Sequence, residues 1–309
     1  MNPFARKRAD SVASLGETAL LAAIRRWLGD AAPDAPFGMG DDCAVLPRAR
    51  AARLVTVDPV IYRRHFDDKV AARDVGAKLL KRNLSDIAAM GGRPIGAVLA
   101  LTLDPRTRLD WLEGFYRGLA ACARRHGVPI IGGDIAETPD TVAASLTLLG
   151  QPSGDRILTR QGAALHDWIF VTGRLGHSLD SGHHFKFTPR LAEGAWLARQ
   201  REVRSMIDVS DGLAKDLKSL TPTGLHPSID ARNIPLRGKA DIAAALSDGE
   251  DYELLFTVAA KTDPAAFARM WRQAFPKIQV SCLGRFEPAG SHDENSLRME
   301  CYHGFEHLH

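Results

Sequence analysis

The sequence has few of the features that mark a secreted, membrane-bound or nucleic-acid-binding protein. Its four cysteines (Cys43, Cys122, Cys282 and Cys301) are far apart and include no CxxC pair. This argues against a zinc site or a disulfide framework and favours the reducing cytoplasm. No stretch approaches the roughly 18 consecutive apolar residues of a membrane helix, and the basic, polar start lacks the apolar segment of a signal peptide. The net charge of +3, with both signs interspersed, gives no reason to expect nucleic acid as a partner.

Several common catalytic motifs are absent as well. Without a GxxxxGK[ST] loop the chain is not a P-loop enzyme, and without HRD and DFG it is not a protein kinase. The GMG at residues 38–40 lacks the third glycine of a dinucleotide-binding loop, and no GxSxG element is present. These absences do not exclude an enzyme that binds a nucleotide without any of these motifs.

What is present is an alternation of strand-like and helix-like segments over 309 residues, a length that suits two α/β domains. The turn-rich sequence QPSGD at 151–155 suggests a boundary, with one domain at residues 1–150 and a second at 151–309. We expect helices at 20–28, 68–90, 109–126, 190–200, 213–220 and 265–273, and strands at 52–58, 95–103, 128–134, 141–150, 168–172, 205–209, 252–258 and 278–284.

Acidic residues cluster at the ends of the expected strands. Asp58 and Asp134 each end a strand, Asp208 and Asp211 flank the end of another, and Asp86 lies within the long helix 68–90. Acids at strand ends project into the crevice where α/β proteins bind ligands, and several carboxylates together need cations such as Mg²⁺ bridging to phosphates. Each acid alone could instead be a turn or cap residue, and Asp211 could be the N-cap of the helix after it.

Seven strings in order resemble the thiamine-monophosphate kinase family of the aminoimidazole-ribotide synthetase-like superfamily. They are GMGDDCAVL (38–46), TVDPVIYRRHF (56–66), NLSDIAAMGGRPIGAVLALTL (83–103), IIGGD (130–134), ILTRQGA (157–163), MIDVSDGLAKDL (206–217) and LSDGEDYELLFTV (246–258). The resemblance implies a two-domain synthetase-like fold whose N-terminal mixed sheet pairs across a homodimer. It also implies direct transfer of a phosphoryl group from ATP to thiamine monophosphate, with several Mg²⁺ ions and no covalent intermediate.

The resemblance also implies the site residues. Metal ligands would be Asp42, Thr56, Asp58, Asp86, Asp134, Asp208 and Asp211, ATP contacts would be Tyr116, Gly133, Asp134, Arg160 and Ser210, and thiamine-phosphate contacts would be His65, Glu250 and Phe305. His65 could also be an ordinary strand-edge residue and Phe305 a core residue.

The sequence departs from the family pattern mainly beside the expected metals. Val57 stands where the family usually has a threonine hydroxyl, and Ile135-Ala136-Glu137 replaces Thr-Thr-Arg after Asp134. Asp248 replaces a glycine before Glu250. These changes leave open a divergent relative that phosphorylates another phosphorylated molecule, or a nucleotide-binding protein without turnover.

Overall fold

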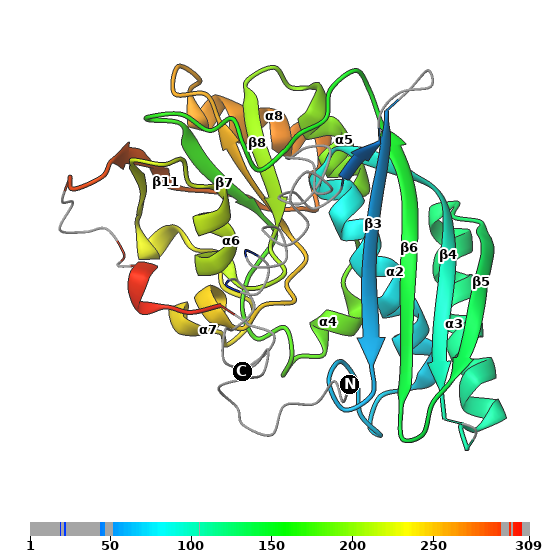
Figure 1. Ribbon diagram of the computed structural model, residues 1–309. Coiled ribbons are helices and arrows are strands. Elements are labelled where there is room, and N and C mark those ends of the chain that lie inside the picture. Colours follow the sequence, from blue (N-terminus) through cyan, green and yellow to red (C-terminus); the bar gives the residue numbers. More distant parts are fainter. Residues whose placement is uncertain are drawn as a thin grey trace.

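The computed structural model describes residues 19, 22, 44–46, 52–104, 106–291, 297 and 299–304. Figure 1 shows two α/β halves side by side, and in the described residues each half is built on one five-stranded sheet. The expected α/β fold with an N-terminal mixed sheet is confirmed. No helix in the described ranges is both long enough and apolar enough to cross a bilayer.

The N-terminal half is a mixed sheet with two long helices against one face (Figure 1). Its strand order is β2-β3-β6-β4-β5, and only the β4–β5 pair is parallel. The two helices cross closely at Gly118, which has no side chain. A Cβ at this position would lie 1.9 Å from the carbonyl oxygen of Arg73. The elements are β2 (Ala44–Leu46), β3 (Arg53–Ile61), α2 (Ala72–Ala89), β4 (Gly92–Leu103), α3 (Leu109–His126), β5 (Ile130–Glu137) and β6 (Val142–Pro152).

The opposite face of this sheet is partly exposed. Val57 of β3 and Ile135 of β5 expose 61% and 63% of their surface, and every residue of β5 is exposed. Register runs straight across the sheet, from Asp58 to Leu146, from Leu146 to Leu99 and from Leu99 to Gly133. At about 4.8 Å per strand, Asp58 and Gly133 are therefore about 14 Å apart.

The C-terminal half is an antiparallel sheet in the order β8-β10-β7-β11-β9. One core cluster includes Leu213 and Leu217 of α6, and a second includes Phe267 and Trp271 of α8. The elements are β7 (Trp168–Thr172), α4 (His183–Lys186), α5 (Leu191–Arg199), β8 (Val203–Asp208), α6 (Leu213–Leu220), β9 (Leu225–Ile229), η4 (Ala231–Asn233), α7 (Ile242–Ser247), β10 (Leu254–Val258), α8 (Pro264–Ala274), β11 (Val280–Pro288) and η5 (Met299–Cys301).

Helix α2 joins the two halves. Its last turn carries Ala88 and Ala89, which pack in the same core cluster as Leu197 of α5 and Phe256 of β10. The contact is close, since a Cβ on Gly194 of α5 would lie 2.1 Å from the carbonyl oxygen of Ala88. The side chains of α2 that face the C-terminal half therefore have fixed positions relative to its loops.

The expected helices and strands are confirmed over the described residues, with some ends displaced. The helix 109–126 and the strand 168–172 have the expected bounds, whereas β10 begins at Leu254 rather than at residue 252. Of the opening helix 20–28 the structure describes only Ala22, which is helical. Six described elements had no counterpart among the expectations, namely β2, α4, β9, η4, α7 and η5. The division at residues 150 and 151 remains a prediction, and β6 continues to Pro152.

Candidate functional site

A pocket of about 340 Å³ lies between the two halves. It is formed by β3 and α2 on one side and by the loops after β8 and before β10 on the other. Its volume is in the range of small-molecule sites. The lining residues are Thr56, Val57, Asp58, Arg64, His65, Arg82, Asp86, Arg160, Leu179, His184, Asp208, Ser210, Asp211, Asp248, Glu250 and Tyr252.

Nine of the residues expected at the site line this one pocket, although they come from both halves of the chain. They are Thr56, Asp58, His65, Asp86, Arg160, Asp208, Ser210, Asp211 and Glu250. Asp42 and Phe305 lie outside the described residues.

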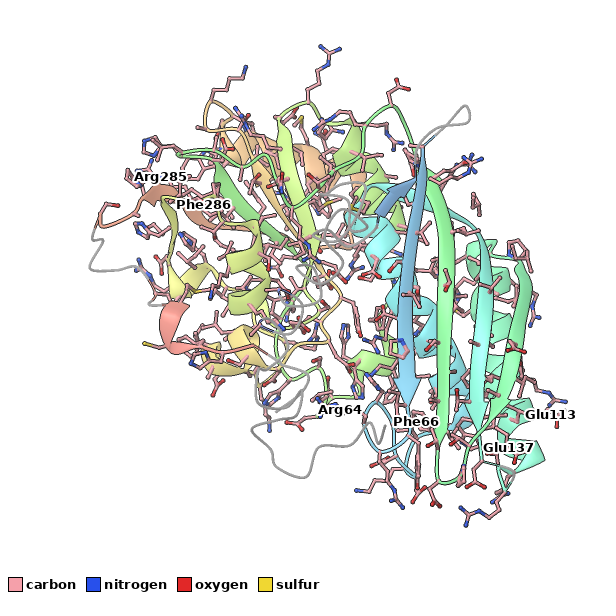
Figure 2. All side chains as sticks on the ribbon, in the orientation of Figure 1. Arg64, Phe66, Glu113, Glu137, Arg285 and Phe286 are labelled. Carbon is pink, nitrogen blue, oxygen red and sulfur yellow. The ribbon has the colours of Figure 1, made fainter. Side chains whose placement is uncertain are left out.

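Three expected residues lie elsewhere in the same chain. Gly133 and Asp134 are on β5, the edge strand on the far side of the N-terminal sheet from β3, and Tyr116 is on α3. Figure 2 shows Glu137 at the end of β5, on the edge farthest from the C-terminal half, whereas Arg64 lies beside the space between the halves. A single chain therefore does not bring these three residues to the pocket.

Consecutive residues of α2 are hydrogen-bonded to side chains from both sheets. Asp86 accepts a hydrogen bond from the hydroxyl of Thr56 on β3. The hydroxyl of Ser85 donates to Oδ2 of Asp208, at the end of β8, over 2.6 Å. Asp208 is only 1% exposed. The helix thus fixes the distance between an acid of its own and an acid from the C-terminal sheet.

The loop after β8 is fastened by a buried acid that sequence reasoning missed. Oδ2 of Asp216 accepts hydrogen bonds of 3.0 Å from the backbone N–H groups of Ser210 and Asp211. Burial raises the pKa of Asp216 well above its usual value, and the nearby charges of Asp211 and Asp208 raise it further. The N-cap alternative for Asp211 is wrong, because Gly212 is the cap of α6 and Asp211 pairs with Lys215 at 2.8 Å.

Two cationic side chains of α2, Lys78 and Arg82, also face this region. They lie eight and four residues before Asp86. Nζ of Lys78 lies 2.6 Å from Oε2 of Glu250, and Lys78 is only 1% exposed. A guanidinium nitrogen of Arg82 lies 3.1 Å from Oδ1 of Asp58. Burial raises the pKa of Glu250, but the charge and hydrogen bond of Lys78, together with the charges of Arg82 and His184, outweigh it, so that the net pKa is lowered. The carboxylate of Glu250, an expected thiamine-phosphate contact, is therefore already paired within the chain. Spacing of three or four residues along a helix was the signal that could have found both cations.

The segment that carries Glu250 has a strained backbone. Glu250 and Tyr252 have φ angles of 54° and 52°, in the left-handed region that side chains other than glycine rarely adopt. Tyr252 is 3% exposed and stacks on Phe187 with ring centroids 4.0 Å apart. Such a conformation persists only where the surroundings impose it.

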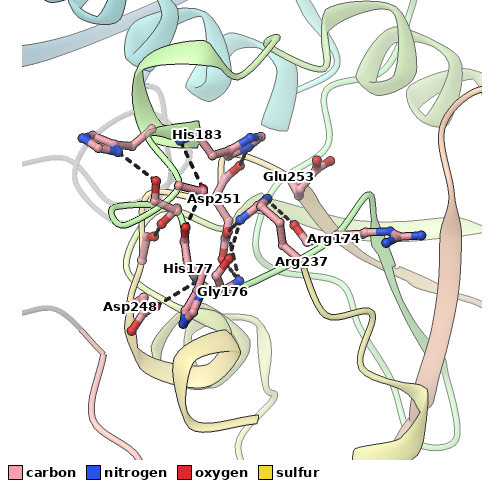
Figure 3. A network of polar contacts seen from close by, with 12 residues as sticks. Arg174, Gly176, His177, His183, Arg237, Asp248, Asp251 and Glu253 are labelled. Carbon is pink, nitrogen blue, oxygen red and sulfur yellow. Dashed lines mark hydrogen bonds and ion pairs between the residues drawn. The ribbon is translucent and has the colours of Figure 1, made fainter. Parts of the chain in front are cut away.

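Those surroundings are a polar network around Asp251 (Figure 3). The carboxylate of Asp251 accepts hydrogen bonds from the backbone N–H of Gly176 and from the guanidinium of Arg237, the latter over 2.5 Å. Asp248 accepts a 2.9 Å hydrogen bond from the N–H of His177. Burial raises the pKa of Asp251 to about 6, although Arg237 opposes the rise. The network anchors the loop that positions Glu250.

Replacing Arg237 by methionine is expected to lower the free energy of unfolding by about 3 kcal/mol. The change leaves the buried charge of Asp251 without its ionic partner, and breaking a buried pair costs about 3–5 kcal/mol. The matched control is Arg232→Met, which removes an 84% exposed arginine paired with Asp230 and should change the free energy of unfolding far less. Urea unfolding of both variants measures the difference, and equal losses would contradict the importance of the network.

The pocket has the donor chemistry of a magnesium site but not a preformed cage. Its acids and the Thr56 hydroxyl offer hard oxygen ligands. Among the described residues, however, no group of three His, Cys, Asp or Glu side chains is close enough to hold an ion. Mg²⁺ usually binds one or two carboxylates together with phosphates and water. The residues therefore fit Mg²⁺ that binds with a phosphate ligand.

Comparisons with known proteins show which chains this one is similar to. A family model described as AIR synthase related protein, N-terminal domain, matches residues 40–151. Thiamine-monophosphate kinase from Salmonella typhimurium is 35% identical over 274 residues, which cover 79% of this chain and 82% of that protein. The crystal structure of thiamine-monophosphate kinase from Stenotrophomonas maltophilia has a TM-score of 0.68 at 31% identity, covering 90% of this chain and 96% of that one.

A second solved structure, AaThiL complexed with AMPPCP and TMP, matches with a TM-score of 0.74 at 26% identity. That match covers 99% of this chain and 100% of the other. Similarity therefore extends over both halves. The chain belongs to the thiamine-monophosphate kinase family.

Proposed function

We propose that this protein transfers the γ-phosphoryl group of ATP directly to thiamine monophosphate, giving thiamine diphosphate. The observation that carries the proposal is the meeting of nine expected site residues, from both halves of the chain, in one pocket. Its relatives are named thiamine-monophosphate kinase, and one similar structure is a complex with AMPPCP and TMP. Direct phosphoryl transfer depends mainly on positioning and charge neutralisation, so no covalent intermediate is needed.

The proposed magnesium ligands within the described part of the chain are Thr56, Asp58, Asp86, Asp208 and Asp211. These residues would hold Mg²⁺, which would neutralise negative charge on the phosphates. On the nucleotide side we assign Arg160 and Ser210, which line the pocket on the C-terminal half. Arg160 offers a planar set of donors suited to phosphate. On the acceptor side we assign His65 and Glu250.

We further propose that the active protein is a homodimer joined through the N-terminal sheets. The exposed face and the unpaired edge of β5 favour association, because exposed strands and apolar faces invite pairing. A partner's β5, placed beside β3, would bring that partner's Gly133 and Asp134 to the pocket. This accounts for the 14 Å that separates them from Asp58 within one chain.

A different phosphorylated acceptor is the second candidate. The pair formed by Lys78 and Glu250 favours it, because a carboxylate already neutralised by an ammonium attracts a thiazolium cation less strongly.

We also propose a cytoplasmic location, since the described cysteines Cys122, Cys282 and Cys301 are free thiols.

The proposal predicts that ADP release in the presence of Mg²⁺ is slow with ATP alone and rises at least tenfold when thiamine monophosphate is added. A coupled assay measures the rate, and mass spectrometry identifies thiamine diphosphate. Stimulation only by another phosphorylated compound would support the second candidate. Nucleotide binding without turnover for any acceptor would indicate a binding protein.

A further inference from the structure

The guanidinium of Arg82 has no assigned function, yet it lines the pocket. It is 13% exposed and is held from two directions by β3. One terminal nitrogen donates to the carbonyl oxygen of Pro59 over 2.6 Å, and the other lies 3.1 Å from Oδ1 of Asp58. The geometry therefore holds a rigid cation at the wall of the site.

The donors of Arg82 are not all used. A guanidinium has five N–H groups in one plane. In the described part of the chain, Nε of Arg82 is buried and makes no hydrogen bond. An unpartnered buried donor costs free energy unless a ligand or water satisfies it. The side chain is thus held in place by two contacts while keeping donors for a third group.

The position of Arg82 along α2 indicates which group that is. Lys78, one turn before it, pairs with Glu250 on the proposed acceptor side. Asp86, one turn after it, is a proposed magnesium ligand that contacts Thr56. From residue 78 to residue 86 the helix rises about 12 Å, so Arg82 lies about 6 Å along the axis from each. An acceptor held near Glu250 must place its phosphate between these two points to reach the metals.

We propose that Arg82 binds the phosphate of the acceptor, and so makes the site specific for a phosphorylated acceptor over its unphosphorylated form. The inference rests on the proposed function and adds a residue to it. Arginine suits the task because its planar donors match a phosphate monoester and its charge is permanent. Asp58 keeps the guanidinium in place through its Oδ1 atom.

The test compares Arg82→Gln with Arg82→Lys and with a control, Arg73→Gln, which removes an exposed arginine from the same helix. Calorimetry measures the binding of thiamine monophosphate and of thiamine to each protein with Mg²⁺ and AMPPCP present. We expect Arg82→Gln to weaken thiamine monophosphate binding at least tenfold, about 1.4 kcal/mol, and thiamine binding less than twofold. Arg82→Lys should lie between Arg82→Gln and the unmodified protein, and Arg73→Gln should match the latter.

The ratio of the two affinities is the deciding quantity, because a general distortion of the pocket would weaken both ligands alike. An unchanged ratio in Arg82→Gln would overturn the assignment of Arg82 while leaving the kinase proposal intact. Failure of the unmodified protein to bind thiamine monophosphate would instead overturn the kinase proposal, and this inference with it. Steady-state kinetics provides a second readout, in which the KM for thiamine monophosphate rises and the KM for ATP stays within twofold.

Discussion

Replacing Asp86 by asparagine is expected to lower the rate of magnesium-dependent phosphoryl transfer by about a hundred- to a thousandfold. Asp86 faces the pocket beside Thr56, and its charge is proposed to act on the metal and the transferring group. The exchange keeps the shape of the side chain and an oxygen that can still accept the Thr56 hydrogen bond. It also removes one of several neighbouring negative charges, so the folded state should lose little stability.

The control is Asp74→Asn, in the exposed first turn of the same helix. Its rate should stay within about twofold of the unmodified protein, because Asp74 is exposed and lies about three turns away from Asp86. Initial rates at saturating Mg²⁺ and ATP measure the effect, and thermal unfolding checks the fold. Calorimetry should also show weaker binding of AMPPCP with Mg²⁺ to Asp86→Asn. A rate close to that of the unmodified protein would refute the metal assignment of Asp86.

Local sequence patterns were enough to predict which helix or strand carries Asp208 and Asp86. Asp208 ends β8 and Asp86 lies in α2, as strand length and helical spacing indicated. These signals are local, because alternation and periodicity depend on neighbouring residues alone. The same patterns predicted α3 to its last residue, where Gly127 adopts a φ of 64° after the helix.

The contacts between distant parts of the chain could not be predicted in this way. Lys78 and Glu250 are 172 positions apart and meet only because α2 packs against the C-terminal half. The late start of β10 has a similar origin, since the left-handed conformations of Glu250 and Tyr252 are imposed by contacts from other segments. Propensity favours a strand at Tyr252, and tertiary contacts override it.

Local patterns also could not predict the distance between Asp134 and the pocket. This distance is one reason why we propose a dimer. Register across the N-terminal sheet puts Gly133 and Asp134 three strands away from Asp58 and Pro59. The resemblance implies that Asp134 belongs to the site, but it does not tell which chain supplies it. The exposed face of the same sheet points to a second copy as the supplier.

Mixing two inactive variants tests this arrangement, and a large recovery of activity is expected. Asp86→Asn and Asp134→Asn should each be inactive alone. In a heterodimer of the two, one site would combine an intact Asp86 with an intact Asp134 from the partner. Random exchange of equal amounts makes half of the dimers heterodimers with one intact site each, so activity should reach about a quarter of the unmodified level.

The matched control mixes Asp86→Asn with Asp58→Asn. Both residues line the pocket of the same chain, so every site in that heterodimer keeps one defect and no recovery is expected. Proteins refolded together after denaturation are compared in the ADP-release assay, and mass spectrometry of intact dimers confirms that heterodimers form. If heterodimers form from Asp86→Asn and Asp134→Asn without recovered activity, Asp134 does not serve the partner's site. The exposed face of the N-terminal sheet would then need another explanation.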